Sequence, residues 1–167
     1  FEPEDEAEVR GTLKTENVWG YSKLGNRSLA LHFKGLAEGR VARASTPTFI
    51  SSLEVAKYFE GRGYKLLASP TLYSGQNLKA RLTAHNDNAN PVDCCLYIRS
   101  YIENDALSIT KATPVLLNPG ETIELDWVVP DTDSSPVAFV GLELSGQDGA
   151  RGSVYLDYLH WQGTPSL

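Results

Sequence analysis

The chain has 167 residues, 41% of them hydrophobic, with a net charge of −6 and a pI of about 5.0. This length is enough for one domain with its own core, because folding at this size buries about 68–70% of the unfolded surface. The acidic balance argues against nucleic-acid binding, which needs a basic surface. No run of eighteen apolar residues is present to span a membrane.

The chain opens with an acidic segment, and it contains no methionine. We therefore expect a single domain over residues 1–167 that has been taken from a longer protein. The acidic segment is interpreted either as a solvated tail or as a source of metal ligands. Its carboxylates are those of Glu2, Glu4, Asp5, Glu6 and Glu8.

Five segments alternate apolar and polar residues with a period of two, which is typical of strands that bury one face. A sixth, GSVYLDYLHWQG, is rich in β-forming residues. Turns rich in Gly, Pro, Asn and Asp separate them, and only SSLEVAKYF (51–59) has the pattern of a short helix. The pattern predicts an all-β fold, either a two-sheet antiparallel sandwich or a barrel. The six segments are 28–34, 78–85, 92–101, 122–129, 136–144 and 152–163, with weaker candidates at 39–45 and 107–110.

No motif places a nucleophile beside a base, and the sequence contains no P-loop, zinc-protease or Cys-x-x-Cys pattern. The three histidines, His32, His85 and His160, fall on different predicted strands. The only cysteines, Cys94 and Cys95, are adjacent and so point to opposite faces of a strand. We therefore expect a protein that is not an enzyme.

The polar face of segment 92–101 interleaves two aromatic rings with a guanidinium: Tyr97, Arg99 and Tyr101. Sugars are bound by such faces, because their C–H surfaces stack on rings while planar polar groups hydrogen-bond their hydroxyls. If segment 78–85 pairs next to this strand, Lys79 and Arg81 join the same surface. The alternative is that these side chains only cover the second face of the sheet.

Trp19 and Tyr21 lie in NVWGYSKLGN (17–26), which lacks clear alternation and is interpreted as a loop. An aromatic ring in such a loop either plugs the end of a sandwich or forms a stacking platform for a ligand. This pair is the alternative candidate for a sugar site.

Asp157 stands in the middle of the last predicted strand, where an unpaired buried carboxylate would be costly. One explanation is a Ca²⁺ ion, which takes six to eight oxygen ligands, held together with Glu2 and Glu4. Such an ion would tie the first and last segments together. The other explanation is that Asp157 pairs with a distant arginine or caps exposed amides at a sheet edge.

The opening FE, the segment GNRSL (25–29) and the closing VYLDYL together resemble the jelly-roll, galactose-binding-like carbohydrate-binding modules of bacterial and fungal glycoside hydrolases. The resemblance implies a jelly-roll sandwich in which Glu2 and Asp157 ligate a structural calcium. ASPTLYSGQ (68–76) and GSVYLDYLHWQG are also similar to the C-terminal accessory domain of ADP-ribosylglycohydrolase-like proteins. That second resemblance implies an attached catalytic domain.

We therefore expect a secreted, non-catalytic carbohydrate-binding module that holds a linked enzyme near a polysaccharide, without nucleic-acid or membrane partners. The rival hypothesis is a structural sandwich that packs against a parent enzyme and binds no sugar; an exposed apolar patch would favour it. The tripeptide beginning at Asn26 also fits an N-glycosylation acceptor.

Overall fold

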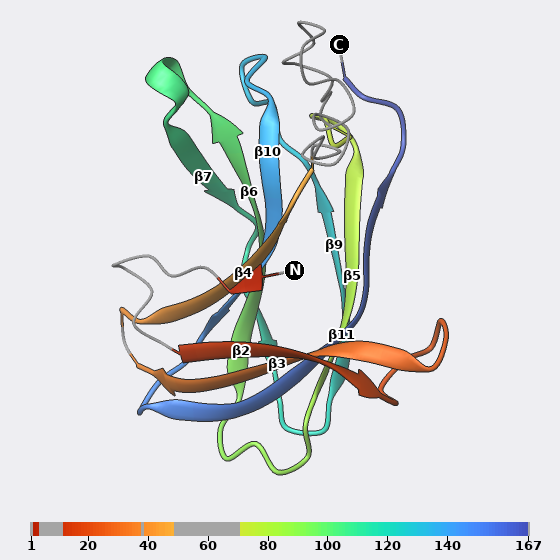
Figure 1. Ribbon diagram of the computed structural model, residues 1–167, viewed down its shortest axis with the longest axis vertical. Helices are drawn as coiled ribbons and strands as arrows, with labels where there is room; N and C mark the ends of the chain where they lie inside the picture. The colour runs from red at the N-terminus through yellow and green to blue at the C-terminus, as the bar shows by residue number, and fades with distance from the viewer. Residues whose placement is uncertain (1, 4–11, 38, 49–70, 167) are drawn as a thin grey trace, which may run out of the picture.

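The computed structural model describes residues 2–3, 12–37, 39–48 and 71–166, with only the backbone of Glu2, Thr12 and Asp105 (Figure 1). These residues form eleven strands and one short 3-10 turn. No helix within these ranges is long and apolar enough to cross a membrane. The elements are β1 (Glu2–Pro3), β2 (Thr12–Trp19), β3 (Arg27–Leu36), β4 (Val41–Pro47), β5 (Asn77–Ala84), β6 (Val92–Tyr101), η1 (Glu103–Asp105), β7 (Leu107–Lys111), β8 (Val115–Leu117), β9 (Thr122–Val128), β10 (Val137–Ser145) and β11 (Ala150–Gln162).

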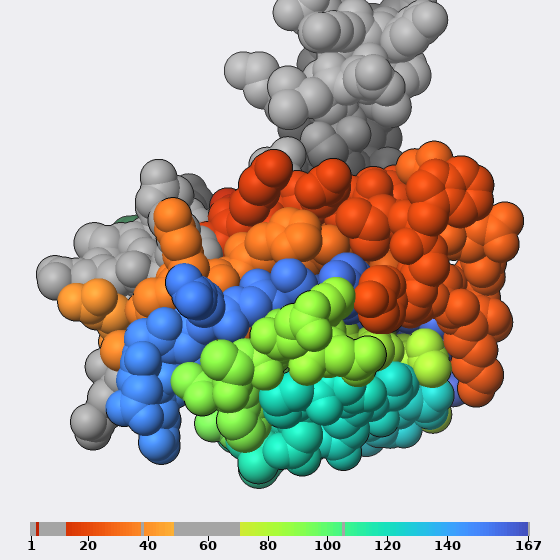
Figure 2. All heavy atoms as spheres, turned by 90° about the horizontal axis from the view of Figure 1, so that it is seen from below, coloured from red at the N-terminus to blue at the C-terminus, as the bar shows by residue number. Residues whose placement is uncertain are grey.

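The strands pair antiparallel in two sheets. The first sheet has the order β1-β4-β10-β6-β7, with β8 pairing on β6 beside β7; the second has the order β2-β3-β11-β5-β9. Seen from below, the second sheet appears as successive bands of red (β2), orange (β3), blue (β11), green (β5) and teal (β9) (Figure 2). The predicted all-β, two-sheet jelly-roll sandwich is confirmed.

One apolar core fills the space between the sheets, built from the inward-facing residues of alternating strands. β5 shows the pattern most simply: Leu78, Ala80, Leu82 and Ala84 are buried and the residues between them are partly exposed. The same alternation holds for the inward face of β6, where Cys94 joins the core as a free thiol. Burial of apolar surface, at about 25 cal/mol per Å², is the main force that holds the two sheets together.

Each of the six main predicted segments forms a strand, and so do both weaker candidates, in β4 and β7. β1, β2 and β8 were not among the predicted strands. β2 was missed because the polar residues Thr15 and Asn17 occupy positions on its inward face, between Leu13, which packs on the core, and Trp19. Trp19 therefore ends a strand and does not lie in a loop. The predicted helix at 51–59 lies outside the described residues.

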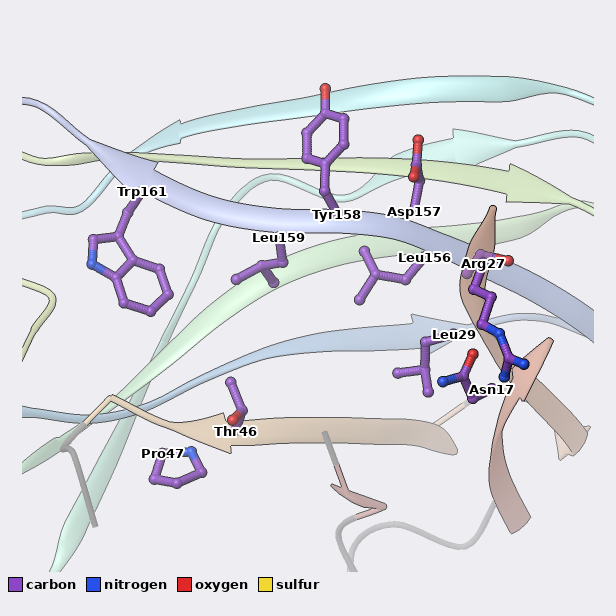
Figure 3. Close-up of a pocket in the computed structure, with 11 residues that line it drawn as sticks. Asn17, Arg27, Leu29, Thr46, Pro47, Leu156, Asp157, Tyr158, Leu159 and Trp161 are labelled. Carbon is purple, nitrogen blue, oxygen red and sulfur yellow. The ribbon is translucent and has the colours of Figure 1, made fainter. Parts of the chain in front are cut away.

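β11 contains a bulge at Asp157. Leu156 is opposite Leu82 and Tyr158 is opposite Arg81, so Asp157 is the extra residue on its strand. An extra residue changes the alternation locally, and both Leu156 and Leu159 consequently face the core. Figure 3 shows Asp157 and Tyr158 on the opposite side of β11. Asp157 lies on the outer face of the second sheet, as Tyr155 two residues before it does, and the bulge brings Tyr158 to the same face.

Candidate functional site

A groove of about 470 Å³ opens at the edge of the sandwich, between β3 and β11 of the second sheet and the end of β4 in the first (Figure 3). We call it the edge groove. Its floor is apolar and consists of Leu29, Leu156 and Leu159. Trp161 lies at one end and Arg27 at the other. Its volume falls within the range of about 300–1,000 Å³ that is usual for ligand pockets.

Polar groups lie around this apolar floor. Asn17 of β2 stands beside Leu29, its cross-strand partner, while Thr46 and Pro47 of β4 form the facing wall. The indole N–H of Trp161 donates a 2.6 Å hydrogen bond to the Thr71 carbonyl, which fixes the ring in the groove. An apolar floor with a few fixed polar groups is the usual composition of a ligand site.

Trp19 extends the groove at its Arg27 end. The two residues are cross-strand partners at the ends of β2 and β3, and the Arg27 guanidinium carbon lies 4.5 Å from the Trp19 ring centroid. This distance is that of a cation–π contact, which orients both groups. Trp19 is 68% exposed, so a large aromatic surface is held in a defined place beside the groove.

Tyr21 lies on the other side of the second sheet from Trp19. Its ring stacks on that of Tyr155, with 3.7 Å between the centroids and an angle of 1° between the planes. Tyr155 alternates with the core residues Val154 and Leu156 and therefore points to the outer face. The predicted pair is thus divided: Trp19 lies beside the edge groove and Tyr21 on the outer face.

Asp157 holds the loop that connects β2 to β3. Its side chain is 1% exposed and accepts hydrogen bonds from the Ser22 hydroxyl at 2.6 Å and the Lys23 amide at 2.7 Å. Arg81 lies 3.3 Å from the same carboxylate. Burial alone would raise the pKa of Asp157, but these hydrogen bonds, one from the Leu24 amide and the Arg81 charge together lower it below its ordinary value. The predicted arginine partner is confirmed, whereas the amides that Asp157 caps belong to the β2–β3 loop and not to a sheet edge.

The calcium hypothesis stays a prediction. The described part of the chain contains no group of three or more His, Cys, Asp and Glu side chains that could hold a metal ion. Glu4 and the side chain of Glu2 lie outside that part. The Ser22 hydroxyl, the Lys23 amide and the Arg81 guanidinium all donate hydrogen bonds to Asp157. A Ca²⁺ site, in contrast, is built from oxygen atoms that face the ion.

The outer face of the first sheet differs from the predicted sugar-binding face. Tyr97 is fully buried, with its ring against Gly141 of β10 and 5.9 Å from the Arg43 guanidinium carbon. A ring without exposed surface has no face to offer a sugar, so Tyr97 is not retained as a ligand-binding residue. Glu143 accepts hydrogen bonds from Arg43 at 2.7 Å and from Lys111 at 2.9 Å on this face.

Two other predicted residues of that face are more accessible. Tyr101 is 37% exposed and Arg99 is half-buried, and both engage other groups of the protein. Arg81 does not join them, because β5 belongs to the second sheet and is not a neighbour of β6. The pairing of segments 78–85 and 92–101, on which the inclusion of Arg81 depended, does not occur, since alternation defines the faces of a strand but not its neighbours.

Arg27, Asn17 and Trp161 were missed as site residues. The alternation of segment 28–34, continued back from Leu29, would have placed Arg27 on the inward side beyond the core. Trp161 follows Leu159 by two residues and so shares its side of the strand. Asn17 carried no such signal, because its strand was not recognised.

Comparison with known proteins supports the fold. No family model matches the chain, and no curated protein matches it. The chain is similar to the CBM22-1 xylan-binding domain from Paenibacillus barcinonensis Xyn10C, with a TM-score of 0.61 and 10% identity over 98% of this chain and 91% of that one. The family 11 carbohydrate-binding module from Clostridium thermocellum, in complex with a β-1,3-1,4-mixed-linked tetrasaccharide, gives a TM-score of 0.53 and 8% identity, over 99% and 88%.

A third structure comes from a study of carbohydrate-binding modules of the β-sandwich superfamily. It has a TM-score of 0.63 and 12% identity over 93% of this chain, which spans 55% of that longer chain. The fold is therefore that of jelly-roll carbohydrate-binding modules, as the resemblance in the sequence implied. These structures do not bear on the resemblance to ADP-ribosylglycohydrolase-like proteins, which stays a prediction.

Proposed function

We propose that the chain is a non-catalytic carbohydrate-binding module and that the edge groove, with Trp19 at its mouth, is its sugar site. The observation that carries the proposal is the exposed Trp19 ring, oriented by Arg27 beside a groove with an apolar floor. The C–H face of a sugar stacks on such a ring, while Arg27 and Asn17 donate hydrogen bonds to its hydroxyls.

The fold supports this proposal. The similar structures include a xylan-binding domain and a module in complex with a mixed-linked tetrasaccharide. Another is a CBM22-1–GH10 pair from Clostridium thermocellum Xyn10B in complex with xylohexaose. By analogy, the present chain would hold a linked catalytic domain near its polysaccharide and so raise the local substrate concentration.

Affinity gels and isothermal titration test the proposal. The wild-type domain should be retained on one or two gels of a panel of xylan, mixed-linkage glucan, cellulose, mannan and pectin. Trp19→Ala should weaken binding about tenfold or more, because Trp is among the residue types that carry most of the affinity of a binding site. Tyr73→Ala is the matched control, since Tyr73 is 40% exposed and lines a different pocket from the edge groove.

Two outcomes would contradict the proposal in different ways. A wild-type domain that no polysaccharide retains would remove the sugar-binding function. Unchanged binding in Trp19→Ala, together with weaker binding in Tyr101→Ala, would move the site to the outer face of the first sheet.

The rival function has an observation in its favour. Exposed apolar side chains occur on both strands that pair with β6 at the margin of the first sheet. Leu107 and Ile109 of β7, each 38% exposed, lie opposite Tyr101 and Arg99, and Leu116 of β8, 53% exposed, lies opposite Asp93 towards the other end of β6. Exposed apolar patches mark protein contacts. If the polysaccharide panel is negative, this margin is where a parent domain would pack.

A further inference from the structure

A row of rings follows β11 on the outer face of the second sheet, on the opposite side of the strand from the edge groove. Tyr155 and Tyr158 belong to β11, as does His160, and Tyr21 lies over Tyr155. Figure 3 shows Tyr158 pointing away from Trp161 and the floor of the groove. Tyr158 also belongs to the lining of the groove, but Tyr21, Tyr155 and His160 do not, so a ligand stacked on Tyr21 would contact rings that a ligand in the groove does not.

Tyr21 is held in an unfavourable backbone conformation. Its φ of 56° lies in the left-handed region, which is rare for a bulky side chain and is usually kept where the surrounding structure or a function requires it. The ring lies parallel to Tyr155, and 42% of the residue remains exposed. His85 stands beside both rings, with its centroid 6.2 Å from that of Tyr21. The result is a flat aromatic platform whose orientation is already fixed.

A second pair of rings lies further along the same strand. The centroids of Tyr158 and His160 are 5.2 Å apart, and His160 is exposed. Because of the bulge at Asp157, these residues lie two and four ladder positions beyond Tyr155, which corresponds to about 7 to 13 Å along a strand. A ligand that touches both groups must therefore be a chain of several units and not a single small molecule.

The charged groups around these rings form pairs of opposite sign. Lys79 lies 3.0 Å from Asp126, and Lys23 lies 3.9 Å from Glu124. Arg81, between the two groups of rings, faces the carboxylate of Asp157. The surface thus offers hydrogen-bond donors and acceptors without an excess of one sign, which favours an uncharged, hydroxyl-rich ligand over an anionic or cationic one.

We propose that this outer face is a second carbohydrate-binding surface, which takes an uncharged glycan chain along β11 with Tyr21 as its main stacking ring. The class of ligand rests on the proposed function, but the surface is separate from the edge groove. If Tyr21 served only to cover Tyr155, its ring and its backbone would matter to stability and not to sugar binding.

Titration calorimetry with xylohexaose and with a β-1,3-1,4-linked glucan oligosaccharide tests the proposal. The wild-type domain should bind with a stoichiometry of two. Tyr21→Ala and Trp19→Ala should each reduce it to one, and the double variant should show no binding. Tyr73→Ala should retain both sites.

Two further variants of Tyr21 separate an effect on binding from an effect on folding. Tyr21→Phe keeps the stacked ring and should retain two sites. Tyr21→Gly removes the ring and accepts the left-handed backbone, so the outer-face site should be lost while the melting temperature changes little. A marked fall in melting temperature in Tyr21→Gly, with two sites retained, would assign Tyr21 to covering Tyr155 and overturn the proposal.

The remaining outcomes distinguish this proposal from the proposed function. One wild-type site that is lost in Trp19→Ala but unchanged in Tyr21→Ala would overturn the second surface and leave the groove. One site that is lost in Tyr21→Ala alone would leave the outer face as the binding surface and overturn the groove. No binding to any probe would overturn both.

Discussion

Asp157 is a charged residue within a strand whose neighbours build the core. Its side chain points away from Leu156 and the core to the outer face, where the β2–β3 loop supplies a hydroxyl and two amides and β5 supplies Arg81. The carboxylate is therefore solvated by the protein in place of water. It orders the β2–β3 loop, which follows Trp19 beside the groove and carries Tyr21 on the outer face.

Replacing Asp157 by asparagine should lower the free energy of unfolding at neutral pH by about 1–3 kcal/mol, because buried donors lose their charged acceptor. The folded-state pKa lies below the unfolded value of about 3.9. The stabilisation is therefore complete above that unfolded value and is lost as the pH falls through the lower folded-state pKa. Urea unfolding between pH 7 and pH 2 measures it.

Asp126→Asn is the matched control for this measurement. Asp126 also pairs with a cation, but its side chain is 54% exposed, and exposed ion pairs contribute little to stability. The difference between wild type and Asp157→Asn should shrink at acid pH. A difference that stays constant down to pH 2 would mean that the charge of Asp157 is not what stabilises the loop.

Residues of four strands meet on the outer face of the first sheet. Tyr97 of β6 lies against Gly141 of β10, and Glu143 of β10 joins Arg43 of β4 to Lys111 of β7. A methyl group added at Gly141 would overlap the Tyr97 ring. This face is packed like a second small core, in which buried charges persist because they are paired.

Tyr97→Ala should therefore act as a core substitution. We expect a loss of about 3–5 kcal/mol in the free energy of unfolding, as for other buried aromatic residues. Tyr101→Ala, on the same strand face but 37% exposed, should cost about 1 kcal/mol or less. Chemical denaturation of both variants measures this. Weaker sugar binding in Tyr97→Ala with unchanged stability would restore it as a ligand residue.

The strands show which features of the fold can be predicted from sequence patterns. Alternation located the strands that build most of the core, because apolar side chains mark their inward face. It missed β2, whose inward positions at Thr15 and Asn17 are polar, and it could not pair the strands it found. The sheet to which Arg81 belongs depends on contacts between distant segments, and these leave no periodic signal in either strand.

The edge groove is a property of the whole molecule. It forms where the end of β4 in one sheet faces β3 and β11 in the other, so its walls come from separate parts of the chain. Sequence patterns placed Trp19 among the candidates but could not show that Arg27, Asn17 and Trp161 line the same groove. The same arrangement puts Trp19 and Tyr21, two residues apart, on opposite sides of one sheet.

Whether calcium links the ends of the chain is also decided at this scale. Asp157 already has an arginine and a set of hydrogen-bond donors around its carboxylate, so we expect any bound calcium to use other ligands. EDTA should then shift the melting temperatures of wild type and Asp157→Asn by the same amount, since the shift depends on the affinity of the folded state for the ion. Differential scanning calorimetry, with elemental analysis of both proteins, measures it. A clearly smaller shift in Asp157→Asn, with less bound calcium, would place Asp157 among the ligands and would mean that the ion displaces Arg81 or the β2–β3 loop from its carboxylate.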